Sequence, residues 1–79
     1  MHREDGSLLI AGWVPADEFA ELIGIALDED RDYETVAGFV IEKMGSLPKL
    51  GEHVDVSGWR IEVIDLDGRR IDKLLVFRL

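Results

Sequence analysis

The sequence contains no cysteine, which excludes a disulfide framework, a thiolate nucleophile and a cysteine-bound zinc site. A small domain without disulfides is typical of the interior of the cell, so we expect an intracellular rather than a secreted protein. No apolar run approaches the roughly 20 residues of a membrane-spanning helix, so we expect no direct membrane insertion by this segment. Bases are scarce: nine Lys and Arg against 17 Asp and Glu give a net charge of −8. That balance argues against nucleic acid as a partner, because the phosphate backbone would be repelled.

Residues suited to catalysis are few. Histidine occurs only as His2 and His53, and His53 falls on the polar side of a predicted strand, where a surface residue is typical. Ser7, Ser46 and Ser57 lie at turn signals, and their positions predict no Ser-His-Asp arrangement. The chain also lacks the dinucleotide-binding glycine fingerprint and the P-loop lysine motif. We therefore expect a domain without catalytic activity.

The first third of the chain predicts a short strand and then a short helix. The strand covers the apolar run at residues 7–13. Pro15 suits the start of a helix, where its missing N–H group costs nothing. Gly24 is the predicted end of that helix. Three apolar residues at i, i+3 and i+4 form its predicted buried face: Phe19, Leu22 and Ile23.

A second helix is predicted between two polar signals. Thr35 is a suitable N-cap, and Gly45 can adopt the left-handed conformation that ends a helix. Gly38 inside the helix should cost about 1 kcal/mol relative to alanine, which indicates a close neighbour at that position. The predicted buried face consists of Val36, Phe39, Val40 and Met44. We expect Phe39, Val40 and Met44 to form a core with Trp59, Ile61 and Val63.

The last third predicts three strands. Alternating apolar residues mark strands at residues 53–56 and 59–66, and Asp67-Gly68 predicts a type I′ hairpin turn before the final strand. In that strand Ile71, Leu75 and Phe77 are expected to share an apolar face, while Leu74, Val76 and Leu79 make its end apolar on both sides. The fold class is therefore α+β: a small antiparallel sheet with two helices packed on one face, in the order β-α-α-β-β-β.

The order and spacing of the motifs resemble the CorC/HlyC transporter-associated domain over nearly the whole chain. Around the first strand and the second helix the matching residues are Asp5-Gly6-Ser7, Gly12, Pro15, Tyr33 and Thr35-Val36-Ala37-Gly38. Further along they are Gly45, Leu47-Pro48, Gly51, Trp59, Val63 and Asp67-Gly68-Arg69-Arg70-Ile71.

This resemblance implies the C-terminal module of proteins with a CBS pair, among them magnesium and cobalt efflux proteins and hemolysin-like membrane proteins. The implied fold is similar to a subdomain of FAD-binding oxidoreductases. The implied role is a non-catalytic cytoplasmic regulatory or assembly module that modulates ion transport. Residues 1–79 would then be a single domain of a larger, membrane-associated protein. The alternative is a small-ligand sensor that binds an adenine nucleotide or a divalent cation.

The loop at residues 28–34 is the candidate metal site, because five of its seven residues are acidic. Asp28, Asp30 and Asp32 alternate as in the first half of an EF-hand, but Tyr33 replaces the required glycine and Phe39 the final glutamate. The EF-hand interpretation therefore fails. A weak Mg²⁺ or Ca²⁺ site at these three carboxylates and a solvated acidic loop remain as alternatives. Residues 45–51 similarly offer either backbone amides for a phosphate or a simple helix cap and turn.

The end of the final strand is the candidate partner interface. Residues 74–79 are apolar on both faces, whereas two short helices can cover only one face of a sheet. We therefore expect a homodimer, or docking on a neighbouring domain of the parent protein. Leu74 and Val76 are predicted to line the contact, with Arg70 or Arg78 at its rim.

Overall fold

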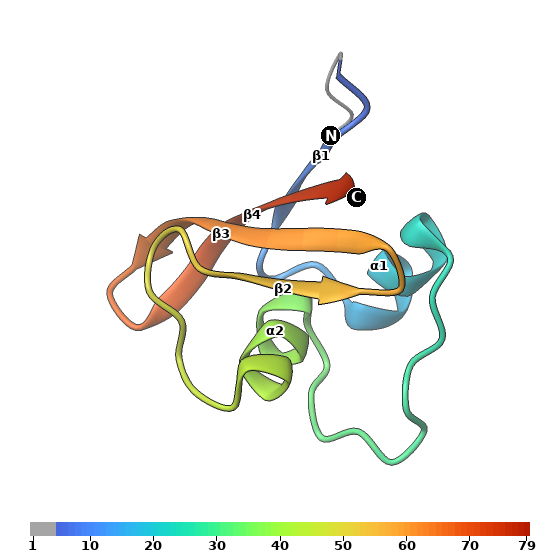
Figure 1. The fold of residues 1–79 in the computed structure, drawn as a ribbon. Coiled ribbons are helices and arrows are strands. Elements are labelled where there is room, and N and C mark those ends of the chain that lie inside the picture. Colours follow the sequence, from blue (N-terminus) through green and yellow to red (C-terminus); the bar gives the residue numbers. More distant parts are fainter. Residues whose placement is uncertain (1–4) are drawn as a thin grey trace.

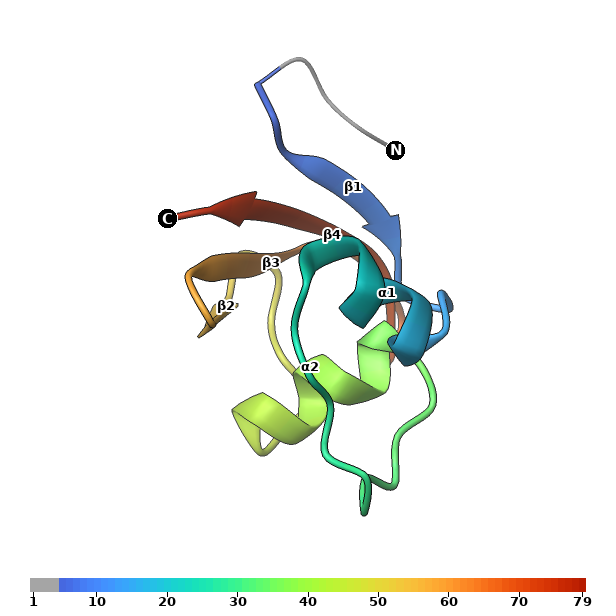
Figure 2. The same ribbon diagram turned by 90° about the vertical axis from the view of Figure 1, so that its right-hand side faces the viewer.

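The computed structural model describes residues 5–79, within which four antiparallel strands form one sheet and two helices cover one of its faces (Figures 1 and 2). The elements are β1 (Leu8–Ala11), α1 (Ala16–Ile23), α2 (Val36–Met44), β2 (His53–Val56), β3 (Trp59–Asp67) and β4 (Arg70–Arg78). The spatial order of the strands is β1-β4-β3-β2. The predicted fold class and element order are thus confirmed.

Helix α1 begins and ends where its sequence signals predict. Pro15 precedes the helix with φ −57°, and Gly24 ends it in the left-handed conformation with φ 72°. The predicted buried face is only partly right, because Leu22 is 50% exposed. At about 100° per residue, a contact face centred between Phe19 and Ala20 leaves Leu22 to one side. The buried residues are Ala16, Phe19, Ala20 and Ile23.

Helix α2 has both predicted caps. The Thr35 Oγ1 atom accepts a hydrogen bond from the Gly38 N–H group at 3.2 Å. At the other end Gly45 has φ 79° and donates its N–H to the Ile41 carbonyl at 2.8 Å. The predicted close neighbour of Gly38 is Tyr33, since a Cβ atom added at Gly38 would lie 2.8 Å from the Tyr33 Cβ atom. The internal glycine therefore allows the loop before α2 to pack on the helix.

The core lies between the two helices and the covered face of the sheet. Phe39 is at its centre, 2% exposed, with its ring centroid 5.8 Å from that of Phe19 and 5.5 Å from that of Tyr33. Four of the six predicted core residues, Phe39, Val40, Ile61 and Val63, are buried. Trp59 and Met44 are only partly buried and pack against the edge of this cluster.

The two hairpin turns differ from each other. Ser57 and Gly58, between β2 and β3, both have positive φ (51° and 85°), as a type I′ turn requires. Between β3 and β4 the pairing of Asp67 with Arg70 makes Gly68 and Arg69 the central residues. Of these only Gly68 has positive φ, at 62°, which is the pattern of a type II′ turn. The predicted hairpin is therefore present, but the predicted type I′ turn centred on Asp67-Gly68 is wrong by one residue.

The apolar face that the sequence predicts for Ile71, Leu75 and Phe77 is divided in the structure. Ile71 is buried and Leu74 and Val76 join it in the core, while Leu75 and Phe77 are half-buried on the opposite face. The cause is an irregularity in the pairing of β3 with β4, where Leu66 pairs with Ile71 but Asp65 pairs with Lys73. Asp72 is thus passed over in the pairing, and the alternation of side chains shifts by one residue.

Candidate functional site

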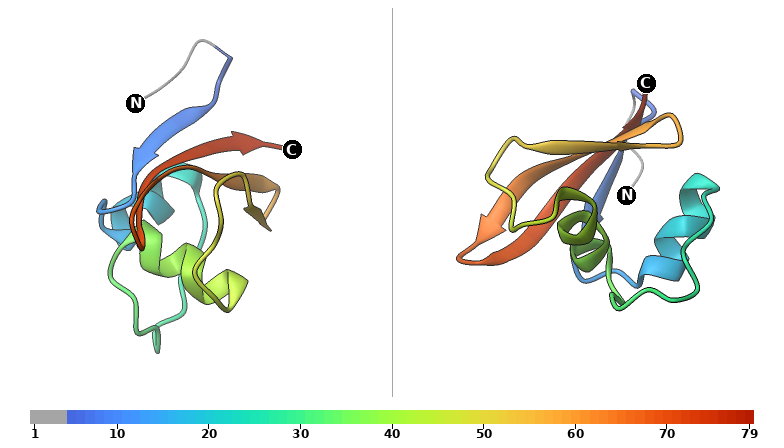
Figure 3. Two further views of the ribbon diagram at one scale, coloured as in Figure 1. Left: turned by 90° about the vertical axis from the view of Figure 1, so that its left-hand side faces the viewer. Right: turned by 60° about the horizontal axis from the view of Figure 1, so that its bottom comes forward.

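The face of the sheet opposite the helices is the first candidate surface. Within residues 5–79 it is covered by no helix (Figure 3), and we call it the open face. The pairing registers define its side-chain rows. These rows are Leu9–Leu75–Glu62–His53, Phe77–Arg60–Asp55 and Ala11–Lys73–Asp65. The open face is therefore apolar over β1 and the end of β4, at Leu75 and Phe77, and charged over β3 and β2 and at Lys73 of β4.

The charged half of the open face is ordered by an ion pair. The Arg60 Nε atom donates to Asp55 Oδ1 at 2.8 Å, and its Nη2 atom donates to Asp55 Oδ2 at 3.1 Å. These hydrogen bonds hold the pKa of the Asp55 carboxyl below its ordinary value. Lys73 and Asp65 form a looser pair at 3.8 Å. Because both pairs are exposed, they add more to the specificity of this surface than to the stability of the fold.

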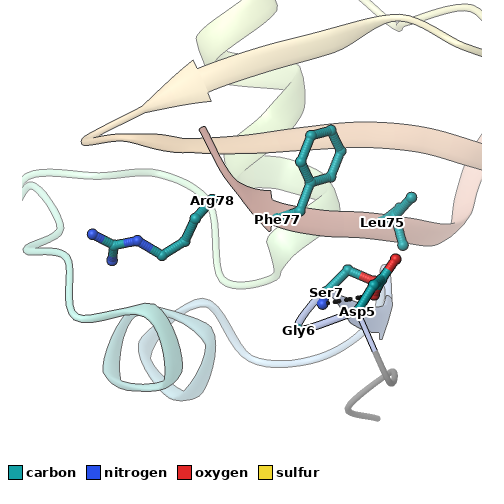
Figure 4. Close-up of a pocket in the computed structure, with 6 residues that line it drawn as sticks. All are labelled: Asp5, Gly6, Ser7, Leu75, Phe77 and Arg78. Atoms are coloured by element: carbon teal, nitrogen blue, oxygen red, sulfur yellow. Dashed lines mark hydrogen bonds between the residues drawn. The ribbon is translucent and has the colours of Figure 1, made fainter.

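A hollow of about 510 Å³ lies at the apolar end of the open face (Figure 4). It is lined by Asp5, Gly6, Ser7, Leu75, Phe77 and Arg78. The Asp5 Oδ1 atom accepts hydrogen bonds from the Ser7 N–H group at 3.0 Å and the Ser7 hydroxyl at 2.6 Å, which fixes one wall. The guanidinium of Arg78 extends away from Leu75 and Phe77 and lies 5.0 Å from the ring centroid of Trp59.

A second hollow of about 300 Å³ lies at the other end of the β1–β4 pair. It is lined by Gly12, Trp13, Thr35, Ala37, Asp67, Arg70, Ile71 and Asp72. We call it the Trp13 hollow, because the Trp13 side chain is 75% exposed there. Sequence reasoning placed Trp13 in the first strand and so missed this surface. The available signal was Gly12 directly before it, a glycine at the end of an apolar run.

The predicted metal residues do not come together. Among residues 5–79 no three His, Asp or Glu side chains are placed to hold a metal ion. The Asp28 Oδ1 atom accepts the Asp30 N–H group at 3.1 Å, and the Asp28 carbonyl accepts from Arg31 Nη1 at 3.1 Å. These bonds shape a turn within the loop. The site at Asp28, Asp30 and Asp32 therefore has no support from the geometry.

The loop at residues 45–51 uses several of its amides in hydrogen bonds within the protein. The Gly51 N–H group donates to the Val63 carbonyl at 2.8 Å, and the Lys49 N–H group donates to Glu52 Oε1 at 2.6 Å. The Gly45 N–H group already caps α2. These amides are thus used by the cap and the turn, which favours the simple interpretation over a phosphate site. Of the two histidines, His53 is exposed in β2, and His2 lies outside the described residues.

The predicted contact residues of β4 need a correction. Leu74 and Val76 are 0% exposed beneath the helices, so they cannot line an outer contact. The register shift described above places Leu75 and Phe77 on the open face in their stead. The two predicted rim residues, Arg70 and Arg78, are both exposed, at opposite ends of β4.

The four-stranded sheet, with one face covered by two helices and the other open, defines a small α+β domain. A family model described as "CorC_HlyC: Transporter associated domain" matches residues 2–79. The chain belongs to this family. No helix in the described part of the chain is long and apolar enough to cross a membrane.

Solved structures share the fold closely. A CorC_HlyC domain from a Xylella fastidiosa Temecula1 hemolysin, in complex with Mg++ and Mn++, is 49% identical with a TM-score of 0.87, covering 100% of this chain and 95% of that chain. A CorC_HlyC domain from Nitrosomonas europaea has a TM-score of 0.93 at 28% identity, covering 100% and 94% of the two chains.

Two longer relatives are similar to this chain only over a short region of their own sequences. UPF0053 protein sll0260 of Synechocystis is 45% identical over 82 residues, which are 100% of this chain and 18% of that protein. A polyamine export protein of Salmonella typhimurium is 37% identical over 78 residues, 98% of this chain and 17% of that protein. The chain thus spans less than a fifth of the length of these two relatives.

Proposed function

We propose that this domain is a non-catalytic regulatory and assembly module of a larger membrane transport protein. It acts on the cytoplasmic side, by docking the open face of its sheet on another part of the same protein. The observation that carries the proposal is the apolar half of that face, where Leu9, Leu75 and Phe77 are only half-buried. Apolar surface of this kind is a common mark of an interaction site.

The partner that covers the open face is inferred from the length of the relatives and the charge of this domain. The matched relatives are more than five times as long as the region they share with this chain, so a transport protein of that kind has ample surface for docking. A net charge of −8 opposes loose contact between identical copies, and Arg60, Asp55 and Lys73 beside the apolar patch offer charged groups for a specific fit. One relative is named a polyamine export protein, and a related domain was solved in complex with Mg++ and Mn++. We propose that the parent protein transports a cation, with magnesium or cobalt implied by the family resemblance.

Thiol labelling tests the docking. The native chain has no cysteine, so a single introduced cysteine reports exposure at one place. Lys73→Cys places it on the open face beside Leu75, at a side chain that is 53% exposed. Glu42→Cys, at an exposed position of α2, is the matched control. In the isolated domain both sites should react with a maleimide at similar rates.

In the full-length protein Lys73→Cys should react several-fold more slowly than in the isolated domain, with labelling read by mass spectrometry of the peptide. Glu42→Cys should be unchanged. Equal rates for Lys73→Cys in the two proteins would refute docking of the open face. Sedimentation of the isolated domain at tens of micromolar should show a monomer. A dimer that protects Lys73→Cys would replace docking within the parent by self-association.

A second candidate function is the sensing of a divalent cation. It is supported by the Xylella fastidiosa domain that was solved with Mg++ and Mn++ at 49% identity. Under this proposal millimolar Mg²⁺ or Mn²⁺ raises the melting temperature, because a ligand that binds only the folded state stabilises it. The triple variant Asp28→Asn, Asp30→Asn, Asp32→Asn locates the site: loss of the rise assigns it to the acidic loop. No rise in the unmodified domain would remove this function.

A further inference from the structure

The Trp13 hollow joins three segments that are distant in the sequence. The turn after β1 supplies Gly12 and Trp13, the region around the N-terminus of α2 supplies Thr35 and Ala37, and the β3–β4 hairpin supplies Asp67 and Arg70 to Asp72. Figure 3 (left) shows the end of β1, the start of α2 and the start of β4 meeting at one end of the sheet. None of the residues of the open face that we propose for docking lies in this hollow.

The backbone beneath Trp13 is held firmly on both sides. The Gly12 N–H group donates to the Asp72 carbonyl at 2.9 Å, and the Gly12 carbonyl accepts the Ala37 N–H group at 3.0 Å. A Cβ atom on Gly12 would lie only 2.1 Å from the Ile71 carbonyl oxygen, so only glycine allows this approach. On the other side of Trp13, the Val14 N–H group donates to the Ala11 carbonyl at 3.2 Å. The exposed indole is therefore presented by a fixed turn.

The groups around the indole select the charge of a ligand. Asp67 is exposed and Asp72 is half-buried, and both line the hollow with Trp13. An aromatic face and a carboxylate each attract an ammonium group, and each disfavours an anion. An indole offers no oxygen ligand to a hard metal ion, so the aromatic part of the lining favours an organic cation over Mg²⁺ or Ca²⁺. A volume of about 300 Å³ is at the lower end of the range of small-ligand sites.

We propose that the Trp13 hollow binds a primary alkylammonium group, with the ammonium at Asp67 and Asp72 and the methylene stem against the indole of Trp13. Arg70 lines the same hollow, and its positive charge repels a cationic ligand. Its positive charge makes binding weak and selective for ligands that also use the indole. The proposal does not depend on docking of the open face.

The two indole N–H signals in an NMR titration test this proposal, because the chain has only two tryptophans. A Trp59→Phe variant assigns them. Adding 1,4-diaminobutane at constant ionic strength should shift the Trp13 indole signal and the amides of residues 67–72 along one saturable curve. The signals of Trp59 and of the loop at residues 28–34 should move little. Equal shifts at the acidic loop, or shifts without saturation, would show only general attraction to an acidic protein and would overturn the site.

Three substitutions make the test specific. Trp13→Leu and Asp72→Asn should each weaken the amine by about 2- to 5-fold, the range expected for an exposed cation–π contact or ion pair. Asp30→Asn, which removes the same charge from the acidic loop, should not. Arg70→Gln should tighten binding, because it removes the competing cation. Unchanged affinity in Trp13→Leu, or weaker binding in Arg70→Gln, would refute the geometry. Melting temperatures of all variants confirm that they are folded.

The source of the ammonium group is distinguished by a second probe. Nα-acetyl-lysine amide carries the same butylammonium group on a peptide backbone. Saturable binding of 1,4-diaminobutane supports a free amine as the ligand. Binding of the lysine amide alone would overturn the free amine and assign the hollow to a lysine on a protein surface.

Discussion

Replacing Phe39 by alanine should remove most of the stability of this domain. The ring is 2% exposed and lies between Phe19 and Tyr33, at centroid distances of 5.8 and 5.5 Å. Deleting such a side chain costs about 3 to 5 kcal/mol, because the transfer free energy is lost and a cavity remains. A chain of this length has an unfolding free energy of roughly 4 to 12 kcal/mol. The melting temperature should therefore fall by about 15 to 30 °C or more.

Circular dichroism during heating, with urea titration at 25 °C, measures this loss. Leu22→Ala is the matched control, because Leu22 is 50% exposed on α1 and its truncation leaves no cavity. It should lower the unfolding free energy by less than about 1 kcal/mol. If Phe39→Ala melted within a few degrees of the unmodified domain, Phe39 would not connect the helices to the sheet as described.

Three further outcomes follow from particular contacts. Gly12→Ala should destabilise the domain by about 1 to 3 kcal/mol, because its Cβ atom would meet the Ile71 carbonyl oxygen. Gly6→Ala is an unsuitable control because Gly6 has positive φ. Ala26→Gly, at an exposed position, is the control and should destabilise the domain only slightly. Leu74→Glu should unfold the domain in urea titrations rather than dissolve a dimer, since the charge would be buried in the core. Asp55→Asn should lower the melting temperature slightly at neutral pH. The hydrogen bonds from Arg60 lower the pKa of Asp55 in the folded protein. The ion pair therefore stabilises the fold fully above the ordinary pKa of 3.8. The difference in melting temperature between the variant and the unmodified domain should vanish as the pH falls through the lower folded pKa.

Local signals explain why the helices could be predicted from the sequence. Thr35 caps its own helix, and Gly24 and Gly45 end theirs, through hydrogen bonds that span only three to five residues. Such interactions depend little on the rest of the fold. The close approach at Gly38 was also predictable, because a glycine inside a helix is costly unless a neighbour requires it.

Contacts between distant segments explain what could not be predicted. The pattern of β4 is apolar on both faces, so the sequence does not indicate which face enters the core. The pairing of β3 with β4, which passes over Asp72, places Leu74 and Val76 in the core. Gly12 before Trp13 signals a break in the strand, but its contact with the Ile71 carbonyl and the exposure of Trp13 depend on a distant segment of the chain. The Arg60–Asp55 pair, in contrast, follows from the two-residue turn at Ser57-Gly58 and was available from the sequence.

Strand β4 connects the core to both candidate surfaces, and this affects how any substitution there must be interpreted. Its inner residues Leu74 and Val76 form the core, while its outer residues Leu75 and Phe77 form the apolar half of the open face. Near its start, the Asp72 carbonyl accepts the hydrogen bond from Gly12 that fixes the turn of Trp13. A charged residue at Phe77 could therefore abolish docking either by unfolding the domain or by disrupting the apolar contact, and the two causes would look alike. Lys73 avoids this ambiguity, because its exposed side chain reports on the open face and contributes little to stability.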